Sequence, residues 1–245
     1  MGSGMFRRKR IMAVILAVIV SAVAFTLYLT WPKPGEFKLV EMHAFVELPS
    51  PETTGTMSVE EAIWRRRSIR SFSDEPLSLQ DISQLAWAAQ GITDPAGKLR
   101  AAPSAGGTYP LEVYVLVSDD GVEELAEGLY RYNHSKHRLE YILKGDLRSG
   151  LAEAALGQSC VKEAPVNIVI AAVYERTTGR YGEHGTRYVH MEAGHVGQNL
   201  YLQATALRLG MVTVGAFYDD QVQELLQLPA DQKPLYIIPI GHPRS

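Results

Sequence analysis

The sequence predicts an α+β fold, in which helices flank a central mixed β-sheet and one transmembrane helix precedes the folded domain. Segments with the 3.6-residue period of helices are interspersed with short segments typical of strands. Residues 166–174, "VNIVIAAVY", are apolar on both faces of an extended chain, which is typical of a central strand. The composition agrees with a folded domain, since 46% of the 245 residues are hydrophobic and 21% are charged.

The N-terminal segment predicts a membrane anchor. Residues 7–10, "RRKR", precede residues 11–31, which contain no charged side chain. As a helix, this uncharged run would be roughly 31 Å long, which matches the hydrocarbon core of a bilayer. Because the basic residues come first, the positive-inside rule places the N-terminus in the cytoplasm and the catalytic domain outside it. We therefore expect a basic tail over residues 1–10 and a single-pass anchor over residues 11–31.

Residues 32–57 predict a linker, because prolines and glycines punctuate both of its ends. Its middle, residues 37–48, is apolar enough to form a short strand that docks on the domain. The globular domain is expected to span residues 58–245, and this length is sufficient to bury a hydrophobic core.

Helices and strands alternate through this domain. The first helix is expected to begin at Ser58, with a capping-box pattern, and to end near Arg67. The second helix is expected to span residues 78–91. The longest helix is expected to begin near residue 186 and to end at Gly210, in the C′ position. The other predicted elements are strands at 112–118, 128–133, 138–145, 166–174, 211–217 and 234–241, and helices at 146–156 and 219–228.

Residues 63–73, "IWRRRSIRSFS", place four arginines within six positions of a chain whose formal net charge is only −3. Guanidinium groups together with a serine hydroxyl can bind a phosphate bidentately. A short basic run is equally typical of a solvated face. No basic stripe extends the cluster, so a nucleic acid is not the expected ligand. From these residues alone, a phosphate site and a solvated face are equally favoured.

A second motif favours the phosphate site. Residues 102–118, "APSAGGTYPLEVYVLVS", form a glycine-containing loop that enters a strand, and such a loop lets backbone amides approach a flat ligand. Together with "RRSIRSF", this loop resembles the FMN-dependent nitroreductase family. "MEAGHVGQNLYLQATALRLGM" and "PLYIIPIGHP" resemble the branch that includes the azoline-oxidising dehydrogenases of the SagB/ThcOx type. The resemblance covers residues 48–243.

The resemblance implies a nitroreductase-like fold, a homodimer, and FMN as the cofactor. Four residues of the basic-serine motif would bind the FMN phosphate, with support from Arg244 near the C-terminus. These four residues are Arg66, Arg67, Ser68 and Arg70. In this family one subunit lays a loop against the flavin that the other subunit holds. The corresponding positions are Pro103, Ser104, Ala105 and Gly106.

The resemblance also implies contacts with the flavin ring. Gln158 corresponds in place to the amide residue that hydrogen-bonds the pyrimidine edge of the isoalloxazine. Gly215 and Ala216 correspond to the strand end whose backbone N–H faces flavin N5. A fixed N–H dipole there would stabilise the charge that develops when N5 accepts hydride.

Arg180 and Tyr181 are the expected catalytic pair. The azoline-oxidising members have a Lys-Tyr pair at the matching place, ahead of the long helix. An arginine cannot act as a general base near neutral pH. This departure from the family pattern favours a quinone- or nitro-type acceptor over azoline oxidation.

The sequence therefore predicts a membrane-anchored, homodimeric FMN oxidoreductase that transfers two electrons to or from a small organic substrate by a ping-pong mechanism. The alternatives are an azoline-type peptide dehydrogenase and a flavin-binding scaffold protein without catalysis. No metal is expected, because Glu192 and His195 form one Glu-x-x-His motif and a carboxylate-bridged di-metal site needs two. Cys160, the single cysteine, is expected to be a small buried core residue.

Overall fold

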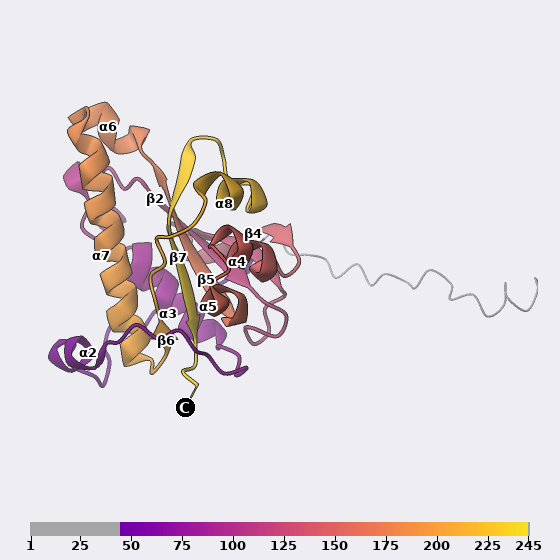
Figure 1. The fold of residues 1–245 in the computed structure, drawn as a ribbon. Helices are drawn as coiled ribbons and strands as arrows, with labels where there is room; N and C mark the ends of the chain where they lie inside the picture. Colours follow the sequence, from indigo (N-terminus) through magenta and orange to yellow (C-terminus); the bar gives the residue numbers. More distant parts are fainter. Residues whose placement is uncertain (1–44, 245) are drawn as a thin grey trace, which may run out of the picture. The chain divides into compact units, whose positions relative to one another are not determined.

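The computed structural model describes residues 45–244, which fold around one sheet of seven strands (Figure 1). The strands lie in the order β1-β4-β3-β2-β5-β7-β6. Their bounds are Phe45–Glu47 (β1), Leu111–Val117 (β2), Gly128–Asn133 (β3), Arg138–Lys144 (β4), Val166–Val173 (β5), Gly210–Met211 (β6) and Gln232–Gly241 (β7).

Neighbouring strands of the sheet pair antiparallel. β5 is buried at every position, as its apolar sequence predicts, because β2 and β7 flank it and helices cover both faces. At the β6 edge, a parallel bridge joins Ser68 to Met211, so the basic-serine motif lies against the sheet and makes it mixed. At the opposite edge, β1 falls within the segment where a docking strand was expected, and residues 37–44 lie outside the described part.

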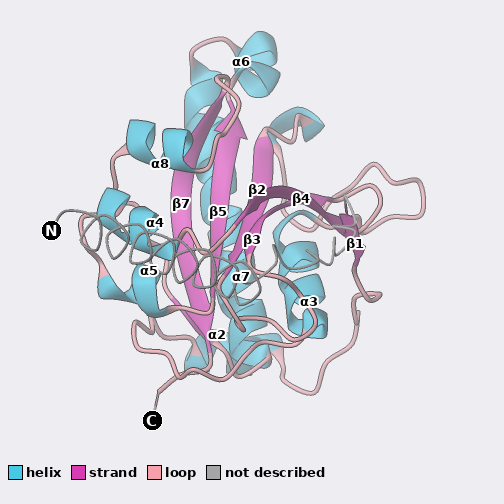
Figure 2. Cartoon of the chain, turned by 90° about the vertical axis from the view of Figure 1, so that its right-hand side faces the viewer, coloured by secondary structure: helices cyan, strands magenta, loops and turns pink. Residues whose placement is uncertain are grey.

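Two layers of helices enclose the sheet (Figure 2). The helix bounds are Val59–Arg65 (α2), Leu79–Gln90 (α3), Arg148–Ala154 (α4), Ser159–Glu163 (α5), Glu175–Tyr181 (α6), His184–Ala206 (α7) and Asp219–Leu225 (α8). The side chains of β2 alternate between two hydrophobic cores, one on each face of the sheet. Val113 and Val115 pack with α3 and α7, whereas Tyr114 and Leu116 pack with α4, α5 and α8.

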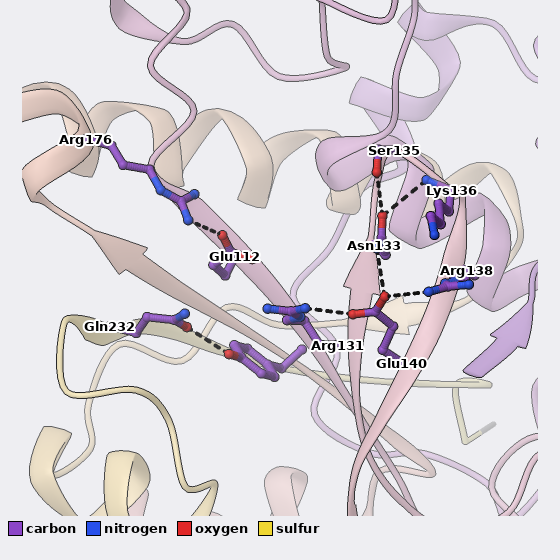
Figure 3. A network of polar contacts seen from close by, with 10 residues as sticks. Glu112, Arg131, Asn133, Ser135, Lys136, Arg138, Glu140, Arg176 and Gln232 are labelled. Carbon is purple, nitrogen blue, oxygen red and sulfur yellow. Dashed lines mark hydrogen bonds and ion pairs between the residues drawn. The ribbon is translucent and has the colours of Figure 1, made fainter. Parts of the chain in front are cut away.

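Polar contacts join β3 to β4 and, separately, β2 to the start of α6 (Figure 3). The Glu140 carboxylate accepts hydrogen bonds from Arg131 at 2.7 Å and from Arg138 at 3.0 Å. The Arg131 hydrogen bond is the largest cause that lowers the pKa of Glu140, to about 2. On β2, Glu112 forms an ion pair with Arg176 of α6 at 2.7 Å. The position of α6 is therefore tied to the sheet.

The end of α7 differs from the prediction, because Gly210 is not the C′ residue of this helix. Arg208 occupies the left-handed C′ position, with φ 62°. Its N–H donates to the carbonyl of Thr205 at 3.1 Å, and the Leu209 N–H donates to the carbonyl of Ala204 at 2.8 Å. These two bonds form a Schellman motif. Gly210 belongs instead to β6.

Two short helices are absent from the sequence prediction. α5 and α6 each span two turns or less, and neither begins with a side-chain cap hydrogen bond. Such helices lack the periodicity and the capping pattern that identify a helix in a sequence. α6 contains Arg180 and Tyr181 in its last turn, ahead of α7.

The predicted membrane location is corrected. Within residues 45–244, no helix is both long enough and apolar enough to cross a bilayer. The expected basic tail, the expected span at 11–31 and residues 32–44 of the linker lie outside the described residues. We therefore retain neither the single-pass anchor nor the extracytoplasmic domain.

Candidate functional site

Residues 66–70, here called the phosphate segment, leave α2 as an extended chain and run along β6. The segment is held to the sheet by the Ile69 N–H, which donates to the carbonyl of Met211 at 2.9 Å. Successive side chains of an extended chain point to opposite sides. One side therefore carries Arg66, Ser68 and Arg70, and the other side carries Arg67 and Ile69.

The first side of the segment meets α7 at Tyr201. The Ser68 hydroxyl lies 2.9 Å from the Tyr201 hydroxyl. The Arg66 guanidinium lies over the Tyr201 ring, 5.0 Å from its centroid. Arg70 is exposed and makes no ion pair with any residue that the structure describes. This side therefore carries two guanidinium groups and a hydroxyl.

Arg67, predicted with this group, occupies a different place. Its Nη1 donates to the carbonyls of Trp64 at 2.9 Å and Arg66 at 2.8 Å, which closes the C-terminus of α2. With Arg65 and Arg208 it also lines an open cavity of about 530 Å³. Helix C-termini attract cations, so all three arginines have a structural reason for their positions.

The residues predicted at the flavin ring lie beside one another. Gln158 Nε2 donates to the carbonyl of Ala216 at 3.1 Å and to that of Ala155 at 3.0 Å. These two bonds use both N–H hydrogens of the Gln158 amide, and the amide oxygen remains available to accept a hydrogen bond. Gly215 is exposed, and a Cβ added there would meet the Tyr236 ring at 3.8 Å. The strand predicted at 211–217 is shorter in the structure, where β6 ends at Met211 and Val214 forms an isolated bridge with Ile237. Residues 215–216, which follow this bridge and are here called the strand end, are therefore open to a flat ligand.

The C-terminus and α5 reach the same edge of the sheet. The Arg244 N–H donates to the carbonyl of Ser71 at 3.1 Å, next to the phosphate segment. Burial raises the pKa of the Cys160 thiol, and the charge of nearby Arg70 opposes that rise. Cys160 is buried, as predicted for a core residue. Together these contacts gather the phosphate segment, Gln158, the strand end and Arg244 into one region.

Residues 103–106, here called the flavin loop, lie against α6. Gly106 has φ 61°, in the left-handed region that favours glycine. Arg180 Nη1 donates to the Gly106 carbonyl at 2.9 Å, and a Cβ at Gly106 would collide with the Tyr181 hydroxyl. Ser104 Oγ accepts from the Tyr109 N–H at 2.9 Å. The predicted catalytic pair and the flavin loop are therefore in direct contact.

Within one chain, the flavin loop and the phosphate segment meet different parts of α7. Pro103 of the loop lies 3.3 Å from His195, through its carbonyl oxygen and the ring Nδ1. Ser68 of the segment contacts Tyr201. These two α7 positions are about 9 Å apart along the helix axis and about 120° apart around it. One chain therefore holds the flavin loop and the phosphate segment on different parts of α7.

A buried polar chain that the sequence did not reveal lies behind the flavin loop. Glu192 of α7 is 2% exposed, and burial raises the pKa of its carboxyl against the opposing hydrogen bonds of Ser104 and Gln90. Arg100 Nη1 donates to Gln90 Oε1 at 3.1 Å, and Arg100 Nη2 lies 2.9 Å from His134 Nε2. Among the residues that the structure describes, no three His, Cys, Asp or Glu side chains lie close enough to hold a metal ion.

Comparison with known proteins identifies the family. The sequence model of the nitroreductase family matches residues 63–242. The chain belongs to the nitroreductase family. It is therefore an oxidoreductase, and its α+β fold with a mixed sheet is the fold of that family.

Several relatives are similar over most of their length. A nitroreductase of Methanocaldococcus jannaschii is 45% identical over 196 residues, which are 80% of this chain and 95% of that protein. A solved nitroreductase from Ralstonia eutropha is 32% identical, with a TM-score of 0.71 over 82% of this chain and 90% of that one. The microcin B17-processing protein of Escherichia coli is 26% identical over 62% of this chain and 57% of that protein.

The residues at the β6 edge fit a flavin phosphate and ring. The exposed hydroxyl of Ser68 and the guanidinium groups of Arg66 and Arg70 suit a phosphate ester. The free amide oxygen of Gln158 suits an N–H of the pyrimidine ring, and the open strand end at Gly215 leaves space beside it.

Gly210 supports the phosphate segment from β6, and we expect Gly210→Ala to disturb it. A Cβ at this position would approach Ile69 Cγ2 to 2.7 Å and Ile69 Cβ to 2.9 Å. Overpacking of this kind costs about 1–3 kcal/mol, and each kcal/mol lowers the Tm of a domain of this size by about 2–4 °C. Thermal unfolding should show this loss as a lower Tm. Gly55→Ala is the matched control, since a Cβ there has no neighbour within 4 Å; equal Tm values for the two variants would contradict the assignment.

Proposed function

We propose that this chain is an FMN-dependent oxidoreductase that passes two electrons to a small organic acceptor of the quinone or nitro type. The observation that supports it most is the convergence of the phosphate segment, Gln158 and the strand end at Gly215 on one edge of the sheet, in a chain of the nitroreductase family. Arg66, Ser68 and Arg70 would bind the phosphate, with Arg244 near them.

Bound FMN would supply reversible two-electron chemistry, and the residues of the chain would orient it and stabilise charge. The amide oxygen of Gln158 would accept from the pyrimidine edge. A backbone N–H at Gly215 or Ala216 would stabilise negative charge near N5 without reorganisation, because the strand end is held in place by Val214, which pairs with Ile237. Arg180, fixed on the flavin loop, would stabilise negative charge on an electronegative acceptor.

A homodimer is part of this proposal, because one chain keeps its flavin loop and its phosphate segment on different parts of α7. Trp64 on α2 and Met191 on α7 are 78% and 53% exposed, and a second copy would cover such side chains. Gly197 lies against Thr213 of the same chain, whereas a Cβ at Gly194 would have no neighbour within 4 Å. Gly194 is therefore the glycine of α7 that a partner helix could approach.

We expect the purified chain to carry a flavin spectrum that bleaches on reduction, and its flavin content to follow its dimeric fraction. The reason is that a complete site would need residues from both copies. Absorbance recorded together with light scattering over a dilution series measures both quantities. A monomer that keeps tightly bound FMN would refute the shared site, and a chain that binds no flavin in any state would refute the proposed cofactor.

The second candidate function is azoline-type peptide dehydrogenation. It is supported by the similarity to the microcin B17-processing protein and to a trifolitoxin operon protein of Rhizobium leguminosarum, which is 25% identical over 86% of this chain and 63% of that protein. The side chain at Arg180 argues against it, because a guanidinium cannot remove a carbon-bound proton near neutral pH.

A further inference from the structure

Tyr201 lies between the phosphate segment and the chain that leads to Gly215. Neither its spacing nor its residue type distinguished it in the sequence. It is on α7, partly buried, with its hydroxyl directed between the phosphate segment and the chain that leads to Gly215. Ser68 Oγ lies 2.9 Å from this hydroxyl, and the Thr213 N–H lies 3.2 Å from it. One phenol oxygen therefore connects two segments that are far apart in sequence.

These contacts have a defined direction once an anion is present. The Thr213 N–H can only donate, so the Tyr201 oxygen accepts from it. The single Tyr201 proton can then be donated to Ser68 Oγ. The proton of Ser68 itself stays free, and Ser68 is exposed. A phosphate ester accepts hydrogen bonds, so it selects the arrangement in which Ser68 donates outward.

The Tyr201 hydroxyl is suited to donate to Ser68. Burial raises the pKa of the phenol, but its hydrogen bonds with Ser68 and Thr213 and the Arg66 charge outweigh burial, so its pKa lies below the ordinary value. A more acidic hydroxyl is a stronger hydrogen-bond donor. The Tyr201 ring also supports Arg66, which lies over it at 5.0 Å.

We propose that Tyr201 is a positioning residue, whose hydroxyl orients the Ser68 hydroxyl toward a phosphate ester. The inference rests on the proposed FMN function and extends it to a residue outside the basic-serine motif. Tyr201 acts through Ser68 and does not itself contact the phosphate. Its hydroxyl should therefore matter for a flavin that carries a phosphate and not for one that lacks it.

The test compares FMN with riboflavin, which has the same ring and no phosphate. Tyr201→Phe removes the hydroxyl and keeps the ring beneath Arg66. We expect the Kd for FMN of the full chain, freed of flavin and titrated by fluorescence quenching, to rise about five- to tenfold, as for one lost hydrogen bond. The Kd for riboflavin should stay within about twofold. Equal weakening for both flavins, or an unchanged Kd for FMN, would overturn the inference.

Two further variants separate positioning from folding. If Tyr201 acts through Ser68, the double variant Tyr201→Phe/Ser68→Ala should bind FMN about as weakly as Ser68→Ala alone, and independent additive losses would contradict the coupling. Tyr130→Phe is the matched control, since it removes a tyrosine hydroxyl bonded to the Ala126 carbonyl at 2.7 Å on β3, away from the β6 edge. It should leave both Kd values unchanged. Failure of the unaltered chain to bind FMN would refute the proposed function as well, whereas tight FMN binding with no response at Tyr201 would refute only this inference.

Discussion

The double variant Arg66→Ala/Arg70→Ala is expected to fold and to bind FMN about 10²- to 10⁴-fold more weakly than the unaltered chain. Each guanidinium would lose a charge-assisted contact with the phosphate worth about 1.5–3 kcal/mol, and each 1.4 kcal/mol is a factor of ten in affinity. Folding should survive, because Arg70 is exposed and pairs with no carboxylate among the described residues, and Arg66 rests on the Tyr201 ring at the surface. Equilibrium titration with FMN measures the loss, and circular dichroism verifies the fold.

The matched control removes two arginines from the other side of the same region. Arg65→Ala/Arg208→Ala changes the net charge equally, but these side chains line the cavity beside Arg67. Arg65 is paired with Glu61 at 2.8 Å. We expect this control to bind FMN within about threefold of the unaltered chain. Equal losses in the two double variants would show that general positive charge attracts the ligand, and full FMN occupancy of Arg66→Ala/Arg70→Ala would refute the phosphate site.

Local sequence patterns predicted the elements that short-range chemistry determines. The second helix begins at Ser78, where Ser78 and Asp81 form a full capping box. The first helix begins after Ser58, whose side chain accepts from the Glu61 N–H. β5 could be predicted because consecutive apolar residues are stable only where both faces are covered. Each of these features depends on residues a few positions apart.

The division of the arginine cluster could not be predicted, because it depends on where α2 ends. The sequence pattern extended this helix to Arg67, whereas the structure ends it at Arg65. Pairing of Ser68 with Met211 on β6 holds the following residues extended. That long-range contact places Arg66 and Ser68 on one side of the chain and Arg67 on the other.

The roles of Tyr201 and Gly210 depend on contacts between distant parts of the chain. Tyr201 contacts Ser68, which lies 133 positions away in the sequence, and no local pattern records such a pair. The sequence predicted Gly210 at the C′ position of α7, because glycine is common at that position. The close approach of Ile69 requires glycine at this position for a different reason, which becomes visible only once β6 and the phosphate segment are side by side.

Arg180→Gln is expected to slow reoxidation of the reduced flavin by a quinone or a nitroaromatic about 10- to 100-fold. Removal of one fixed group that stabilises developing negative charge has effects of this size or larger in other enzymes. The guanidinium is held on the flavin loop by its bond to the Gly106 carbonyl, so its charge is already in place before an acceptor arrives. Stopped-flow reoxidation of the chemically reduced protein measures this step without a physiological donor.

Arg176→Gln is the matched control, because Arg176 is on the same helix but pairs with Glu112 at 2.7 Å (Figure 3). Arg176 also donates to the Tyr109 carbonyl at 3.1 Å. We expect its reoxidation rate to stay within about threefold of the unaltered chain. Equal slowing in both variants would indicate that α6 has shifted and that the charge of Arg180 is not responsible.

The same variants decide between acceptor reduction and azoline oxidation. Aromatisation of an azoline requires a base that removes a carbon-bound proton while hydride is transferred to the flavin. Arg180 is a permanent cation and cannot be that base, and the Tyr181 hydroxyl lies beside Gly106 on the flavin loop, next to the Arg180 guanidinium. We therefore expect no azole product from an azoline peptide, by mass spectrometry, under conditions in which the quinone is reduced. Azole formation that is unaffected by Arg180→Gln would show that neither the proposed acceptor class nor the role of Arg180 is correct.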